Sequence, residues 1–111
     1  MVDYFGVTLT LGHDRARLQL RGELDSAATD ELSARVDEAC ATEPSLLLVD
    51  LSELSFCDSS GIRVLLLAAA QCARTDIDMR LVGTRSNVRR IFELTHTAHL
   101  LKFANGDGGE H

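Results

Sequence analysis

Apolar and polar residues alternate along two short segments near the start of the chain, residues 7–11 and 16–20. Alternation of this kind is typical of strands that bury one face. The residues between them, 12–14, are Gly, His and Asp, a combination that favours a turn. We therefore expect the fold to begin with an antiparallel hairpin.

The rest of the chain switches between helical and extended patterns. Apolar residues recur at helical spacing over residues 28–40, 60–74 and 86–92. Further strands are expected at residues 46–51, 79–82 and 100–103. Asp25 or Ser26 is available to cap the first helix. Because strands alternate with helices after the hairpin, we expect an α/β fold with a mixed, mainly parallel sheet.

The junction between the third expected strand and the second expected helix carries several polar residues. Asp58, Ser59 and Ser60 stand together there, directly before Gly61. A helix N-terminus leaves backbone N–H groups without partners, so one Asp or Ser is common there as a cap. The excess over one residue indicates a hydroxyl group presented to another molecule, with Gly61 permitting close approach. A purely capping role is the alternative.

Composition limits the kind of molecule that these elements form. The chain has 111 residues, of which 45% are hydrophobic, enough for one domain with one core. Its formal charge of -6 repels the phosphate backbone, so we expect no direct binding to nucleic acid, even at Arg85, Arg89 and Arg90. Residues 105–111 contain no apolar residue and are expected to form a flexible tail after a domain over residues 1–104.

The targeting features of the sequence point to the cytoplasm. The first residues lack a basic region followed by an apolar stretch, which a secretory signal would need. The longest apolar run, residues 64–70, is far shorter than the roughly 18 residues of a membrane span. We expect a cytoplasmic protein that does not enter the membrane.

The remaining reactive side chains give no complete enzyme or metal site. The four histidines have no triad context, and neither a Gly-x-Ser-x-Gly elbow nor a Gly-x-x-x-x-Gly-Lys-Ser/Thr loop occurs. His96 and His99 could share a metal, but no third ligand is indicated. We expect no catalytic residue, metal or cofactor. A serine hydrolase that uses Ser59 or Ser60 is the enzyme alternative.

The three cysteines divide into two kinds. Cys40 and Cys72 fall at apolar positions of predicted helices and are expected to be small core residues. Cys57 lies beside the polar junction. It could act there as a redox sensor, provided that its thiolate is accessible.

Three segments have features of one known family. They read GELD at residues 22–25, DLSELSFCDSSGI at residues 50–62 and SNVRRIF at residues 86–92. Together they resemble the motifs of STAS-domain anti-sigma factor antagonists, over nearly the whole chain. The resemblance implies the STAS arrangement, in which a mixed sheet carries its main helices on one face. It also implies an acceptor serine at the start of the second main helix, where the residue pattern independently places Ser59.

The resemblance implies a partner-switching role. The unphosphorylated protein would bind an anti-sigma factor with a serine kinase fold, and sigma factor would then be released to polymerase. The kinase, which supplies ATP and Mg²⁺, would phosphorylate Ser59 and end the interaction, and a phosphatase would restore Ser59. This chain would be a substrate and not a catalyst.

The resemblance also assigns individual residues to the site. Ser59 matches the phosphoacceptor, Asp58 its acidic neighbour and Asp25 the acidic position of the GELD motif, near the partner surface. The expected contact is completed by Ser60, Gly61, Ile62 and Arg63. Arg63 stands where relatives often have Gly and could select an acidic patch on the partner.

Two alternatives stay open for this family resemblance. Asp25 could serve only as a helix cap, and Ile62 could belong wholly to the core. The domain could also be a STAS scaffold component, or a sensor of a small ligand or nucleotide, without a phosphoswitch.

Overall fold

The alternating segments at the start of the chain form the expected antiparallel hairpin. In the computed structural model, which describes residues 4–104, strand β1 (Gly6–Gly12) pairs with β2 (Arg15–Leu24). The turn between them places Asp14 at a φ of 61°. This left-handed conformation is one that Asp and Asn tolerate better than most other residues. The turn chemistry of the sequence therefore fixes the hairpin.

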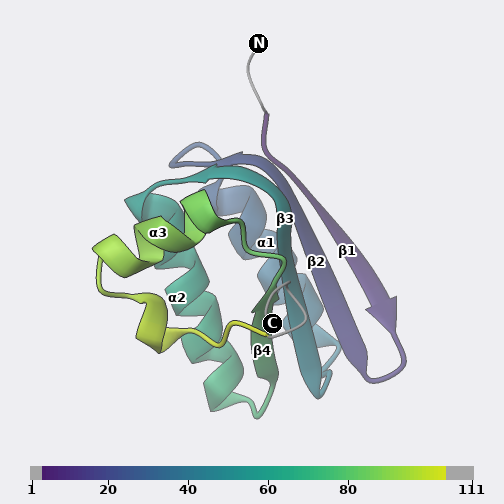
Figure 1. The fold of residues 1–111 in the computed structure, drawn as a ribbon. Helices are drawn as coiled ribbons and strands as arrows, with labels where there is room; N and C mark the ends of the chain where they lie inside the picture. The colour runs from purple at the N-terminus through teal and green to yellow at the C-terminus, as the bar shows by residue number, and fades with distance from the viewer. Residues whose placement is uncertain (1–3, 105–111) are drawn as a thin grey trace.

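The described residues form one mixed sheet with helices on a single face (Figure 1). The strand order is β1-β2-β3-β4, and β3 (Leu46–Cys57) and β4 (Asp78–Val82) run parallel to β2. The helices are α1 (Thr29–Ala41), α2 (Ser59–Arg74) and α3 (Ser86–Leu94). The expected α/β class, with its mixed sheet, N-terminal hairpin and one-sided helices, is confirmed.

The core lies between the sheet and the helices. Side chains of β2 alternate, so that Leu18 and Leu20 are fully buried against the helices while Arg17 lies on the open face of the sheet. Where α1 and α2 meet, the Cys40 and Cys72 sulfur atoms are 3.9 Å apart. Cys72 is buried and Cys40 half-buried, so both are small packing residues, as their positions in the sequence predicted.

Strands β2 and β3 extend further than the sequence pattern indicated. Gly22 adopts a φ of 81°, and the pairing of β2 with β3 shifts register beside it. Gly accepts this conformation without strain, and after a bulge at Ser55 of β3 the pairing resumes at Glu23 with Phe56 and ends at Leu24 with Cys57. The GELD segment is therefore part of the sheet, and β3 leads almost directly into α2.

The start of α1 differs from the expected cap. The residue before the helix is Ala28, which provides no side-chain hydrogen bond, so neither Asp25 nor Ser26 caps it. The Asp25 carboxylate instead accepts the Ala27 N–H at 3.1 Å, and its carbonyl accepts the Ala28 N–H at 3.0 Å. Asp25 thus stabilises the turn that precedes the helix.

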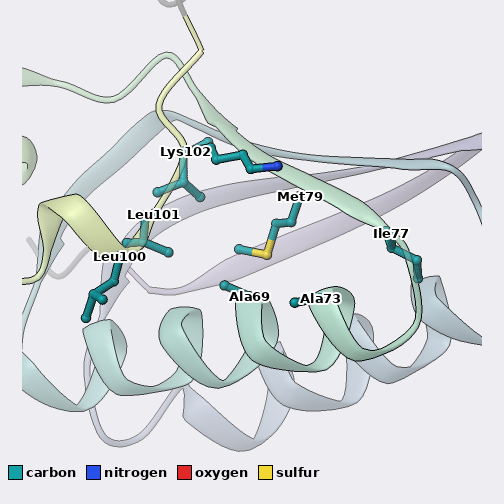
Figure 2. A pocket seen from close by; sticks show the side chains of 8 residues that line it. Ala69, Ala73, Ile77, Met79, Leu100, Leu101 and Lys102 are labelled. Carbon is teal, nitrogen blue, oxygen red and sulfur yellow. The ribbon is translucent and has the colours of Figure 1, made fainter.

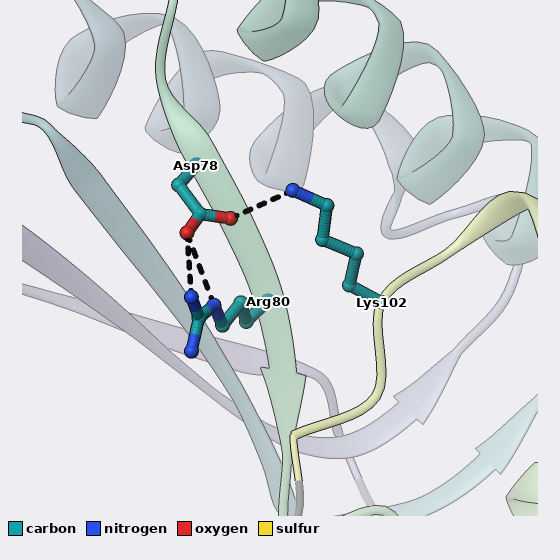
Figure 3. Close-up of polar contacts among 3 residues, drawn as sticks. All are labelled: Asp78, Arg80 and Lys102. Carbon is teal, nitrogen blue, oxygen red and sulfur yellow. Dashed lines mark hydrogen bonds and ion pairs between the residues drawn. The ribbon is translucent and has the colours of Figure 1, made fainter.

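The last described residues close the outer edge of β4, although the expected strand at residues 100–103 is reduced to a single bridge. A short 3₁₀ helix, η1 (Ala98–Leu100), precedes it. Leu81 then donates its N–H to the Lys102 carbonyl at 2.8 Å and accepts the Ala104 N–H at 2.9 Å. Figure 3 shows that Lys102 also pairs with Asp78 at 3.0 Å. The predicted tail, residues 105–111, lies outside the described residues.

Candidate functional site

The site is built where β2 and β3 end side by side. Leu24 pairs with Cys57 at the last positions of the two strands, and the Asp58 N–H donates to the Leu24 carbonyl at 3.2 Å. Parallel strands end at the same edge of a sheet, so Asp25 and Asp58, one residue further on, emerge from neighbouring strand ends. The GELD and DSSG segments, far apart in sequence, thereby meet.

Asp58 is the cap of α2. Its Oδ1 accepts hydrogen bonds from the Ser60 N–H at 3.0 Å, the Gly61 N–H at 3.1 Å and the Ser60 hydroxyl at 2.6 Å. The Ser60 hydroxyl, followed by these backbone donors, outweighs partial burial and lowers the pKa of the Asp58 carboxyl. Asp58 is therefore a fixed negative charge at the helix start.

The two adjacent serines differ in their environment. The Ser60 hydroxyl is half-buried and bound to Asp58. Ser59 is the first residue of α2 and is exposed, and its hydroxyl makes no hydrogen bond within residues 4–104. The local geometry thus distinguishes the serines, which at the level of sequence only the family resemblance did, and it leaves Ser59 accessible to a second molecule.

Gly61 and Ile62, which the sequence predicted to complete the partner contact, are both buried in the structure. A Cβ atom at Gly61 would lie 2.7 Å from Leu24 Cγ and 2.9 Å from Cys57 Sγ. Gly61 is therefore needed for the close packing of α2 on the strand ends, and not for the approach of another molecule. Ile62 is only 3% exposed and belongs to the core.

Arg63 and Asp25 do reach the surface around Ser59. Arg63 is exposed on α2, four residues after Ser59, a spacing that places two side chains on the same helix face. Asp25 is half-buried and lines a hollow of about 330 Å³ together with two further carboxylates, Glu23 and Glu31. The surface beside Ser59 therefore carries both signs of charge.

Cys57 cannot serve as the accessible redox sensor considered from the sequence. Its side chain is 1% exposed, and burial, assisted by the negative charge of Asp58, raises the pKa of its thiol to about 12. The thiolate is the reactive form of cysteine. Cys57 is thus a packing residue beneath Gly61.

The segment of β3 that leads to Asp58 is held by contacts that sequence reasoning missed. Arg85 donates to the Ser52 carbonyl at 2.9 Å, and Asn87 donates to the Ser55 carbonyl at 3.1 Å. Both donors lie at the start of α3, in or beside the SNVRRIF segment. Polar residues at the start of a helix were the available signal, but their distant acceptors could not be inferred from spacing.

A cavity of about 190 Å³ lies between α2, β4 and η1, as Figure 2 shows. Its lining is apolar apart from Lys102, whose ammonium group is paired with Asp78. Ligand sites are usually about 300 Å³ or larger and present several convergent polar groups. This cavity is therefore smaller and less polar than a usual ligand site.

Two general findings limit the chemistry of residues 4–104. No cluster of three or more His, Cys, Asp or Glu side chains in this range is arranged to hold a metal ion, so His96 and His99 gain no third ligand. None of the helices in this range is long and apolar enough to cross a membrane.

Comparison with known proteins identifies the family. A model of the STAS domain matches residues 10–106, and the chain belongs to the STAS domain family. In sequence it is similar to the anti-sigma-B factor antagonist of Listeria monocytogenes, with 24% identity over 86% of this chain and 83% of that protein.

Solved structures of the anti-sigma factor antagonist SpoIIAA have the same fold. The unphosphorylated form matches with a TM-score of 0.75 and 22% identity, covering 89% of this chain and 88% of that one. The phosphorylated form, described as a Bacillus cell fate determinant, matches with a TM-score of 0.67 and 20% identity over 91% of each chain. The family recognised from the three sequence motifs is thus confirmed.

Proposed function

We propose that this chain is an anti-sigma factor antagonist that binds an anti-sigma factor serine kinase while Ser59 is unphosphorylated, and so releases sigma factor. The observation that carries the proposal is the exposed Ser59 hydroxyl, which has no hydrogen-bond partner in residues 4–104 beside the bound pair Asp58 and Ser60. The names of the Listeria relative and of SpoIIAA, solved with and without phosphate, support the same role.

Phosphorylation of Ser59 ends the interaction. The kinase transfers the γ-phosphoryl group of its ATP to Ser59 Oγ, the hydroxyl proton leaves, and ADP stays on the kinase. Mg²⁺, the base and the phosphate clamp belong to the partner, so this chain is the substrate. A phosphatase later hydrolyses the phosphoserine and restores the binding form.

The switch acts through local charge. A phosphate adds about -1.5 to -2 charge beside the ionised Asp58. The Ser60 and Gly61 N–H groups already bond to Asp58, so they are not available to draw the phosphate into the helix start. The phosphate therefore projects to the surface, where Arg63 is the cation on the same helix face. Repulsion and bulk at this surface release the partner without refolding the domain.

Phosphosite mass spectrometry on the protein from its source cells, beside purified protein incubated with ATP and Mg²⁺ alone, tests the proposal. We expect phosphate on Ser59 in the cellular sample only. The matched variants are Ser59→Ala, which should abolish the modification, and Ser60→Ala, which should retain it. Phosphate on Ser60, or on Ser59 with ATP alone, would overturn the assignment.

Partner capture tests the second half of the proposal. Ser59→Ala used as bait should retain the anti-sigma factor kinase, because it keeps the contact surface and cannot be modified. Ser59→Asp should bind more weakly, since it places a second carboxylate beside Asp58. Equal affinity of wild type and Ser59→Asp for the kinase would argue against a charge-operated switch.

A further inference from the structure

Strand β1 forms an outer edge of the sheet without the usual protection against pairing. It is a terminal strand in the order β1-β2-β3-β4. Its sequence, GVTLTLG, contains no charged residue and no proline, and its ladder with β2 has no bulge. Natural edge strands commonly carry a charged residue, a proline or a bulge. Each of these hinders pairing of the unpaired N–H and C=O groups with another strand. Leu11 on β1 is also 55% exposed.

The outward backbone groups of β1 can be assigned from the neighbouring ladder. The Asp14 carbonyl accepts the Ser45 N–H on the β3 side at 3.1 Å. Bonding direction alternates along a strand, so the odd-numbered residues of β2 bond toward β1, and their even-numbered partners on β1 bond inward. The N–H and C=O groups of Val7, Leu9 and Leu11 therefore point away from the sheet.

The chemical types along β1 are the same in both directions about Leu9. The mirrored pairs are Gly6 with Gly12, Val7 with Leu11, and Thr8 with Thr10. A two-fold interface presents the same patch from both subunits, so it requires a surface that is complementary to itself. A strand with this symmetry is complementary to itself along its whole length. Binding of a peptide from another protein would not require such symmetry in β1.

We propose that β1 pairs antiparallel with β1 of a second copy, across a two-fold axis at Leu9, so that two sheets become one. Leu9 then lies opposite Leu9 of the second copy, and Val7 lies opposite Leu11, which covers the exposed Leu11 side chain. These are the three positions whose backbone groups point outward, so both edges offer donors and acceptors in register.

The two faces of the joined sheet also match. Thr8 and Thr10 are exposed on the open face of the sheet. In the proposed register Thr8 lies opposite Thr10 of the second copy, and Thr10 lies opposite its Thr8. Cross-strand threonine pairs are favourable. Ser59 follows β3, which is not adjacent to β1, so the pairing leaves the candidate phosphorylation site accessible.

Sedimentation equilibrium of the full chain over a range of concentrations tests the proposal, with two double variants. In Thr8→Glu/Thr10→Glu, like charges face each other across the axis. In Thr8→Glu/Thr10→Lys, opposite charges do. We expect a concentration-dependent dimer for wild type and a dissociation constant roughly tenfold higher for the first variant than for the second. Both positions are exposed, and urea unfolding of the monomers serves as the control.

A proline pair checks the assignment of the outward groups. Leu11→Pro removes an N–H that faces away from β2, so the monomer should fold while the dimer is lost. Thr10→Pro removes an N–H that bonds to β2, so it should destabilise the monomer itself. A chain that stays monomeric at every concentration, or equal dimerisation of the two charge variants, would overturn the proposal.

Discussion

Asp58 and Ser60 form a closed pair at the start of α2, in which one carboxylate oxygen accepts both the N–H and the hydroxyl of Ser60, at 3.0 and 2.6 Å. This pair fixes the direction of the helix start and uses the hydroxyl of one serine. The neighbouring Ser59 hydroxyl is left at the surface. The two functions of the junction, capping and presentation, are thus divided between adjacent residues.

Substitutions of Asp58 should separate the contribution of its capping hydrogen bonds to stability from the contribution of its negative charge. Asp58→Ala removes the cap and should lower the free energy of unfolding by about 1 kcal/mol, whereas Asp58→Asn keeps an acceptor and should lose only a few tenths. Urea denaturation of the two variants measures the difference. An equal loss in both would mean that the carboxylate charge, and not its geometry, stabilises the helix start.

Gly61→Ala should destabilise the domain, although alanine favours helices. The added methyl group would lie 2.7 Å from Leu24 Cγ and 2.9 Å from the Leu24 carbonyl oxygen. Overpacking of this kind typically costs about 1–3 kcal/mol, which exceeds the gain of about 1 kcal/mol from helix propensity. Ser59→Ala, at an exposed position of the same turn, is the control and should change stability by less than about 0.5 kcal/mol. A stabilised Gly61→Ala protein would contradict the packing described for α2.

Thiol labelling should distinguish the three cysteines. In the native protein at mildly alkaline pH, iodoacetamide should reach the half-buried Cys40 first and leave Cys57 unmodified, because burial raises the pKa of the Cys57 thiol to about 12. Intact-mass and peptide analysis after increasing times gives the order. In urea all three should react at similar rates. Early labelling of Cys57 in the native state would restore the redox interpretation.

Stability should fall in acid partly through Asp50. Burial raises the pKa of this carboxyl, but hydrogen bonds from Ser52 and the nearby Arg17 guanidinium outweigh burial and lower it overall. The native state therefore binds the proton less readily than the unfolded state. The stabilisation is present above the unfolded value of about 3.9 and is lost as the pH falls through the lower folded value.

Asp50→Asn is the matched variant for this pH dependence. It should be less stable than wild type at neutral pH, because the ion pair with Arg17 is gone, and the difference should shrink in acid. Urea unfolding as a function of pH measures both effects. A constant difference at every pH would show that the charge of Asp50 does not contribute.

The sequence predicted the elements better than their ends. Periodicity placed the hairpin, the parallel strands and the three main helices because each has a clear apolar face. It ended the third expected strand at residue 51, because the apolar run there gives way to hydroxyl and acidic residues. The strand continues to Cys57 because β3 bulges at Ser55, opposite Gly22 and Glu23 of β2, and pairing then resumes. A bulge of this kind depends on two strands and cannot be inferred from either alone.

The candidate site was predicted only in part, because some of its features also depend on contacts between distant segments. The excess of polar residues at the junction placed Ser59 at the start of a helix, where the structure has it. It could not tell Ser59 from Ser60, or show that Gly61 faces Leu24 inside the molecule, because those facts depend on the packing of α2 against another strand. The binding roles of Asp25 and Arg63 remain predictions.

The closure of the sheet beyond β4 limits how large an assembly can become. At that edge Leu81 already bonds to Lys102 and Ala104, so its backbone groups are not available to a neighbour. A sheet with one occupied edge and one free edge can accept a single partner sheet. If β1 pairs as proposed, the assembly would stop at two copies, and the contact at Leu81 would hinder the addition of a further sheet along β4.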